Sequence, residues 1–133
     1  MIVRHLRDII GTDCDVDTQN WNSRRLLLKR DNVGFSLHDT IIKAGTETKI
    51  WYKHHVEAVY CIEGEGEIEL IESNEVYRIE AGMMYVLNGH EKHLLRGTTD
   101  MRMICVFNPA CSGAEVHDEE GAYVPEEVQK AGL

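Results

Sequence analysis

The feature of this sequence that most limits its fold is a repeated alternation of apolar and polar residues, interrupted every few residues by a turn signal. Residues 67–70 (EIEL) alternate strictly, and comparable short runs occur at 24–29, 35–43, 76–79, 83–87, 93–96 and 101–107. A longer run at 49–60 is expected to be one extended segment. Because strand side chains alternate between two faces, the pattern predicts about nine short strands. Short strands with frequent turns favour an all-β sandwich or closed barrel over an α/β fold.

Turn and helix signals divide the chain further. Asp31-Asn32, Ser73-Asn74 and Asn88-Gly89 are turn dipeptides between predicted strands. Helix signals are confined to the ends of the chain, where a proline at 125 and a glycine at 132 bracket a one- or two-turn helix at 125–131. We therefore expect a barrel over 1–112 and a C-terminal tail of the same domain over 113–133.

Charge and length narrow the classes of function. The chain has 133 residues, enough for one domain with a single core. Its 14 basic and 23 acidic residues give a net charge of −9, and no basic cluster occurs. This balance argues against nucleic acid or an anionic membrane as partner. The chain shows no signal peptide and no membrane span, and its four cysteines show no CxxC spacing, so we expect reduced thiols and a cytoplasmic location.

Two motifs at fixed spacing suggest a particular barrel. The stretch 45–64 fits the spacing of the first cupin motif, G-x5-H-x-H-x3-E-x6-G, with Gly45, Glu57 and Gly64 in place. Trp51 and Lys53 occupy its two histidine positions. The first motif therefore retains its glutamate but lacks its usual histidine ligands.

The second cupin motif, G-x5-P-x-G-x2-H, lies one hairpin further along the chain. It maps onto Gly82, Asn88, His90 and His93, and only the first glycine and the histidine are retained. The sequence resembles the cupin superfamily in this respect, which implies a double-stranded β-barrel (a jelly roll) whose strands point ligands into its mouth.

Longer segments carry a more specific resemblance. The phrases RLLLKRDNVGFSLHDT, EAVYCIEGEGEIE, MYVLNGHEKHLLRG and ICVFNPACSGAEVHDEEGAY together resemble the ectoine synthase family, and the likeness extends from Met1 to about Pro125. The resemblance implies a homodimeric cupin enzyme, a carbon–oxygen hydro-lyase. Its reaction would cyclise N-γ-acetyl-L-2,4-diaminobutyrate with loss of water to give ectoine, a compatible solute used in osmoadaptation.

The resemblance also implies a metal site formed by Glu57, Tyr85 and His93, with Fe(II) expected first and zinc or manganese as alternatives. Residues 51, 53, 55 and 57 share one strand face, so alternation predicts that Lys53 and Glu57 point into the barrel together. A protonated lysine has no free lone pair for a metal, which makes Tyr85 on a neighbouring strand a reasonable donor. An oxygen-rich ligand set suits Fe(II) or Mn(II) more than a structural zinc.

From the same resemblance we expect eight residues around the substrate: Trp21, Arg25, Thr40, Tyr52, Cys105, Phe107, Glu115 and His117. An arginine suits a bidentate grip on the substrate carboxylate better than a lysine does, which gives Arg25 its role. Trp21 and Phe107 are expected to wall the pocket, although core packing explains either equally well. The alternative interpretation of Arg25 is an ordinary surface arginine.

Four of these residues are the candidates for catalysis: Tyr52, Thr40, Glu115 and His117. An extended segment would present Glu115 and His117 on one face, which makes them a pair suited to proton transfer, although a solvated acidic tail is the plainer interpretation. Strict alternation turns Tyr52 away from the Glu57 face, so its role requires a twist or bulge near Lys53. Residues from about 113 onward are expected to close over the substrate as a lid.

Three other functions remain open from sequence alone. A cupin that binds a small molecule without converting it would explain the missing histidines. An Fe(II) dioxygenase would use the same three ligands, and oxygen consumption would reveal it. A metal-free isomerase would leave the register of Glu57 and His93 unexplained.

Overall fold

The computed structural model describes residues 1–113, which form ten strands and two short 3-10 helices. Along the chain these are η1 (Leu6–Asp8), β1 (Asp15–Asp17), β2 (Trp21–Leu27), η2 (Lys29–Asp31), β3 (Ser36–Ile42), β4 (Glu47–Ile50), β5 (Val56–Glu63), β6 (Glu65–Leu70), β7 (Val76–Glu80), β8 (Met84–Leu87), β9 (His93–Gly97) and β10 (Met101–Asn108). The helix expected at 125–131, and nearly all of the expected tail over 113–133, lie outside the described residues.

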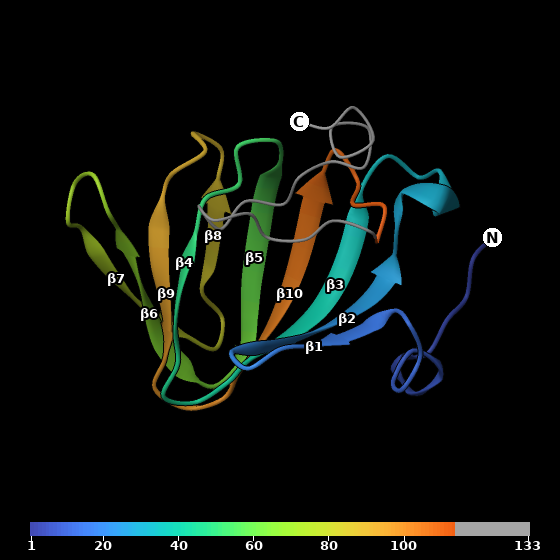
Figure 1. Ribbon diagram of the computed structural model, residues 1–133, viewed down its shortest axis with the longest axis horizontal. Coiled ribbons are helices and arrows are strands. Elements are labelled where there is room, and N and C mark those ends of the chain that lie inside the picture. Colours follow the sequence, from blue (N-terminus) through green and yellow to red (C-terminus); the bar gives the residue numbers. More distant parts are fainter. Residues whose placement is uncertain (114–133) are drawn as a thin grey trace.

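The strands form two antiparallel sheets (Figure 1). The larger sheet has the order β1-β2-β3-β10-β5-β8, and the smaller has the order β4-β9-β6-β7. Side chains of both sheets contribute to one apolar cluster, for example Val59 and Met103 from the larger sheet with Ile68 and Leu95 from the smaller. The prediction of an all-β protein is therefore confirmed.

The register of the larger sheet sets a row of side chains on its inner face. Arg25 pairs with His38, His38 with Cys105, Cys105 with Val59, and Val59 with Tyr85. Directly paired residues lie on the same face of a sheet. Four strand spacings of about 4.8 Å separate the ends of the row, so the backbones of Arg25 and Tyr85 start about 19 Å apart along the sheet.

The expectation of one extended segment over 49–60 is wrong. β4 ends at Ile50 and belongs to the smaller sheet, whereas β5 begins at Val56 and belongs to the larger one. The connecting residues 51–55 form a loop with a bend at 53–54, so alternation does not extend through it. In consequence Tyr52 is buried, while the Nζ atom of Lys53 lies 4.7 Å from the centroid of the Trp51 ring. The expectation that Lys53 points into the barrel beside Glu57 is therefore wrong as well.

We expected helical turns only at the ends of the chain, and this expectation is wrong. η2 occupies the turn between β2 and β3, and the carboxylate of Asp31 accepts a hydrogen bond from the backbone N–H of Leu28 at 2.9 Å. Asn32, which follows, adopts the left-handed conformation that asparagine tolerates. The Asp31 carboxylate thus caps the backbone of Leu28, three residues earlier, and stabilises a helical turn. The sequence signal at Asp31-Asn32 had indicated only a turn between two strands.

Gly64 shows why the first motif ends in glycine. Its φ is +92°, and a Cβ at this position would lie 2.0 Å from the backbone oxygen of Asp100. Only glycine adopts this conformation without strain and permits this close approach.

The four cysteines are free thiols, with Cys61, Cys105 and Cys111 buried and Cys14 half-buried. This agrees with the expected absence of disulfides. Within residues 1–113, no helix is long and apolar enough to cross a membrane.

A candidate active site in the barrel

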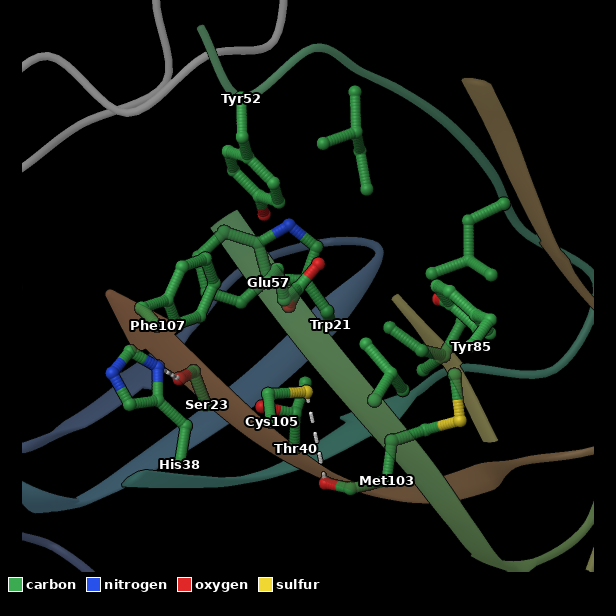
Figure 2. A pocket seen from close by; sticks show the side chains of 14 residues that line it. Trp21, Ser23, His38, Thr40, Tyr52, Glu57, Tyr85, Met103, Cys105 and Phe107 are labelled. Carbon is green, nitrogen blue, oxygen red and sulfur yellow. Dashed lines mark hydrogen bonds between the residues drawn. The ribbon is translucent and has the colours of Figure 1, made fainter. Parts of the chain in front are cut away.

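A buried pocket lies on the inner face of the larger sheet (Figure 2). Its lining consists of Trp21, Ser23, His38, Thr40, Ile42, Ile50, Tyr52, Glu57, Val59, Tyr85, Leu95, Met103, Cys105 and Phe107. The cavity volume is about 40 Å³, more than the roughly 10–15 Å³ that one water molecule needs. The structure thus brings together seven of the predicted site residues: Trp21, Thr40, Tyr52, Glu57, Tyr85, Cys105 and Phe107.

The pocket holds a carboxyl group in an apolar setting. Glu57 on β5 is 6% exposed, and burial raises its pKa to about 8. The neighbouring Cys105 thiol opposes this shift of the Glu57 pKa in part. Burial, and then the nearby Glu57 charge, raise the pKa of the Cys105 thiol well above its usual value, and the neighbouring Thr40 hydroxyl lowers it in part. Thr40, Cys105 and Glu57 line the pocket from β3, β10 and β5, and the Cys105 thiol donates to the carbonyl oxygen of Met103 at 3.9 Å.

Tyr85 on β8 lies next to Glu57. Its backbone pairs with Val59, one step along the same face from Glu57. Burial raises the pKa of the Tyr85 phenol well above its usual value, and the nearby Glu57 carboxylate raises it further. In the absence of a bound cation, this environment favours the neutral forms of both acids.

His93 comes from the other sheet. It is fully buried at the start of β9, and its Nδ1 lies 3.0 Å from the carbonyl oxygen of Glu91. A carbonyl only accepts, so Nδ1 carries the proton and Nε2 keeps its lone pair. Nε2 has no hydrogen-bond partner among residues 1–113, and burial lowers the pKa of the ring. His93 does not line the pocket, but its ring centroid lies 6.5 Å from that of Tyr52, which does.

The described residues contain no group of three or more His, Cys, Asp or Glu side chains arranged to hold a metal ion. The predicted ligands are Glu57, His93 and Tyr85, and a tyrosine is not one of these four residue types. The absence of such a group therefore does not bear on the predicted metal site. Its members individually suit a cation: Glu57 is a buried carboxyl, and His93 presents a buried lone pair at Nε2. The metal site remains a prediction that these environments fit.

Arg25 is buried. The alternative interpretation of Arg25 as a surface arginine is therefore wrong. Its side chain is inside the barrel, where Nη1 donates to the carbonyl oxygen of Gly113 at 3.3 Å and Nε lies 3.5 Å from the hydroxyl of Ser23. Arg25 is not among the residues that line the pocket, but it pairs with His38, which is. A buried guanidinium behind the polar end of the pocket suits an anionic ligand.

His38 and Ser23 line the pocket and were missed by the sequence analysis. His38 is 1% exposed, with Nδ1 3.3 Å from the Ser23 hydroxyl and with Nε2 lacking a hydrogen-bond partner within residues 1–113. Burial, with smaller contributions from the nearby charges of Arg25 and His55, lowers the pKa of His38 to about 3. Alternation along β3 would have found this residue, because His38 shares a face with Thr40.

Aromatic contacts build the wall beside the carboxyl group, because Phe107 on β10 pairs directly with Glu57 on β5. The Phe107 ring centroid lies 4.9 Å from that of His38 and 5.2 Å from that of Tyr52. His55 packs edge-on against the same ring at 5.8 Å, and its Nδ1 donates to the carbonyl oxygen of Pro109 at 2.9 Å. His55 therefore supports the Phe107 wall from behind and does not line the pocket, while the neighbouring His54 is exposed.

Two predicted catalytic residues, Glu115 and His117, lie outside the described residues, as does the expected lid. Their roles remain predictions.

Comparison with known proteins gives consistent matches. The model of a family described as ectoine synthase matches residues 1–127. An L-ectoine synthase of Halalkalibacterium halodurans is 60% identical over 123 residues, 92% of this chain and 95% of that protein. The crystal structure of ectoine synthase from P. lautus superposes with a TM-score of 0.86 at 69% identity and covers 91% of this chain and 87% of that one.

A more distant structure bears on the fold alone. The cupin domain of a transcriptional regulator from Enterobacter cloacae superposes with a TM-score of 0.57 at 16% identity, over 68% of this chain and 97% of that one. The predicted cupin double-stranded β-barrel is confirmed.

Proposed function

Because the chain belongs to the ectoine synthase family, whose members are enzymes, we propose that it converts N-γ-acetyl-L-2,4-diaminobutyrate into ectoine. The α-amine nitrogen attacks the acetyl carbonyl carbon and forms a C–N bond. The C–O bond of the tetrahedral adduct then breaks, and the oxygen leaves as water with two protons taken from the nitrogens. The product is a cyclic amidine, and no oxidant or reductant is required.

The observation that supports this proposal best is the division of the pocket into chemically different ends. Glu57 and Tyr85 occupy one end, whereas His38 and Ser23, with Arg25 behind them, occupy the other. A substrate with an acetamide group at one end and a carboxylate at the other fits such a division. Arg25 would attract the carboxylate, and Glu57 would lie on the side of the acetamide.

We propose Glu57, Tyr85 and His93 as ligands of a catalytic metal, Fe(II) first, with manganese or zinc as alternatives. Burial of Glu57 without a charge partner among residues 1–113, together with the lone pair at His93 Nε2, supports this set. When bound, such a metal would supply Lewis acidity to a carbonyl oxygen.

The chain's own residues would orient the substrate and move its protons. Thr40 and Cys105 line the pocket together with Glu57, and their hydroxyl and thiol would hand a proton on at the reacting end of the pocket. Tyr52 brings its phenol into the pocket through the loop at 51–55 and would serve as a proton donor at the carbonyl. Trp21 and Phe107 would exclude bulk water, which otherwise favours the open amide. Glu115 and His117 are proposed as further proton-transfer residues.

We propose that the enzyme acts as a homodimer in the cytoplasm and serves osmoadaptation. The outer face of β5 and β8 exposes large apolar side chains, with Tyr60 48%, Met84 57% and Val86 41% exposed. A second copy of the chain packed there would remove this apolar surface from water. Reduced, buried thiols suit a reducing compartment.

The test is product formation by the purified, iron-loaded protein, followed by chromatography. We expect ectoine from the wild type and little from Glu57→Ala, with His54→Ala as a matched control because His54 is exposed outside the pocket. Equal product from wild type and Glu57→Ala would remove Glu57 from its proposed role. No product from either, with bound iron confirmed, would count against the reaction and favour a binding cupin.

A further inference from the structure

Two loops meet at one end of the barrel, and each delivers a residue to the candidate site. Residues 51–55 connect β4 to β5 and carry Tyr52, whose side chain lines the pocket. Residues 88–92 connect β8 to β9 and lead directly into His93. Figure 1 shows both loops at the same end of the molecule.

His90 joins these loops through its side chain. Its Nδ1 lies 2.9 Å from the carbonyl oxygen of Tyr52, and because a carbonyl only accepts, His90 is the donor. A second contact reinforces the first, since the Nζ atom of Lys92 lies 4.1 Å from the centroid of the Trp51 ring. The Tyr52 carbonyl and the neighbouring Trp51 side chain are thus both in contact with the 88–92 loop.

The backbone conformation of His90 would suit glycine better than histidine, which indicates that the imidazole has a role at this position. Its φ is +54°, in the left-handed region that favours glycine, and it occupies the glycine position of the second cupin motif. A strained residue persists where its surroundings hold it in place. Here the retained imidazole makes a bond to Tyr52 that glycine would lose.

The same loop also holds the imidazole of His93. The carbonyl oxygen of Glu91 accepts the His93 Nδ1 proton at 3.0 Å, and the carboxylate of Glu91 accepts the N–H of Gly89. Any shift of residues 88–92 would therefore act on Tyr52 and on His93 together.

We propose that His90 is a positioning residue, which fixes the Tyr52 main chain so that the Tyr52 ring stays in the pocket. The centroid of the Tyr52 ring lies 5.2 Å from that of Phe107, in edge contact, and 6.5 Å from that of His93. His90 touches neither substrate nor reacting atoms, and acts by anchoring the loop at 51–55. The consequence for catalysis rests on the proposed function, whereas the anchoring itself does not.

Two substitutions separate the hydrogen bond from the backbone strain. His90→Gly relaxes the positive φ but removes the donor. His90→Asn tolerates the same φ, and its amide N–H₂ replaces the Nδ1 donor. His54→Ala is the matched control, because it removes an exposed imidazole from the loop at 51–55. If His90→Gly does not fold, His90→Asp makes the same comparison, since aspartate tolerates the same φ as asparagine and its carboxylate has no hydrogen to donate.

The first readout is Trp51 fluorescence in the metal-free protein, which needs no activity. The chain has two tryptophans, so a Trp21→Phe background isolates Trp51. We expect His90→Gly to shift the emission to longer wavelength and to increase acrylamide quenching, while His90→Asn and His54→Ala match the background protein. Equal spectra for His90→Gly and the background would overturn the anchoring.

The second readout is steady-state kinetics of the iron-loaded protein with the native Trp21. We expect His90→Gly to lower kcat/KM by about 10- to 100-fold, with its melting temperature unchanged or raised. His90→Asn should stay within about threefold of wild type. A loss in His90→Asn as large as in His90→Gly would refute the hydrogen bond as cause. If the wild type forms no ectoine, the proposed function fails and the fluorescence comparison still decides the role of His90.

Discussion

The protonation of His38 offers a quantitative test of how the pocket is built. The ring is 1% exposed, and burial beside Arg25 and His55 lowers its pKa to about 3 from an ordinary value of 6.5. Between these two pH values the unfolded chain binds a proton that the folded protein does not. The free energy of unfolding therefore falls as the pH falls from 6.5 towards 3, and this contribution is fully present above pH 6.5.

The size of this effect follows from the linkage relation. Each pH unit between the two pKa values removes 1.36 kcal/mol, so lowering the pH from 6.5 to 4.5 removes about 2.7 kcal/mol through His38 alone. His38→Gln abolishes the titration and keeps a neutral, hydrogen-bonding side chain. Whatever the variant's stability at pH 7, its stability relative to wild type should improve by about 2.7 kcal/mol at pH 4.5.

The assay is urea unfolding of metal-free protein, followed by far-UV circular dichroism at several pH values between 7 and 4.5. His54→Gln serves as the control for an exposed imidazole. A difference between His38→Gln and wild type that is the same at pH 7 and pH 4.5 would refute the argument, because His38 would then titrate equally in both states.

Three further predictions concern stability. In metal-free protein the pKa of Glu57 is raised to about 8 from 4.5, so stability present below pH 4.5 is lost as the pH rises towards 8. Glu57→Gln should therefore gain about 3 kcal/mol over wild type between pH 4.5 and pH 7 in urea unfolding, and a constant difference would contradict this. Gly64→Ala should destabilise the fold by about 3 kcal/mol or more, because its Cβ would meet the Asp100 oxygen at 2.0 Å and its φ is +92°; a melting temperature equal to wild type would be the contrary result. Asp39→Ala should destabilise by about 3–5 kcal/mol, because Asp39 pairs with Arg24 at 2.7 Å and with Arg102 at 2.7 Å, and both Arg24 and Asp39 are buried; Glu63→Ala, at the exposed end of the same network, is the control.

Local alternation predicted most of the strands, whereas the residues of the pocket were expected from the family resemblance. Thr40, Cys105 and Glu57 lie on inward positions of strands that the pattern indicated, and the register of the larger sheet brings them together. His38 follows from strand alternation, because it lies two residues from Thr40 on the same face of β3. No long-range information was needed for it.

The loop at 51–55 could not be predicted in this way. The run from Lys49 to Tyr60 contains neither glycine nor proline, so nothing local indicates that the chain leaves one sheet and enters the other. That crossing depends on which strands pair across the barrel, and it reverses the expected directions of Tyr52 and Lys53. The burial of Arg25 is similarly a tertiary effect, because its contact with Gly113 joins residues 88 positions apart.

Anaerobic conversion of N-γ-acetyl-L-2,4-diaminobutyrate by the iron-loaded protein, followed by proton NMR, tests the central claim most directly. Since ring closure with loss of water needs no oxidant, we predict that ectoine accumulates mole for mole as substrate disappears, at the same rate with and without oxygen. Unchanged substrate in the presence of bound iron, or turnover that occurs only when oxygen is consumed, would contradict the proposed reaction.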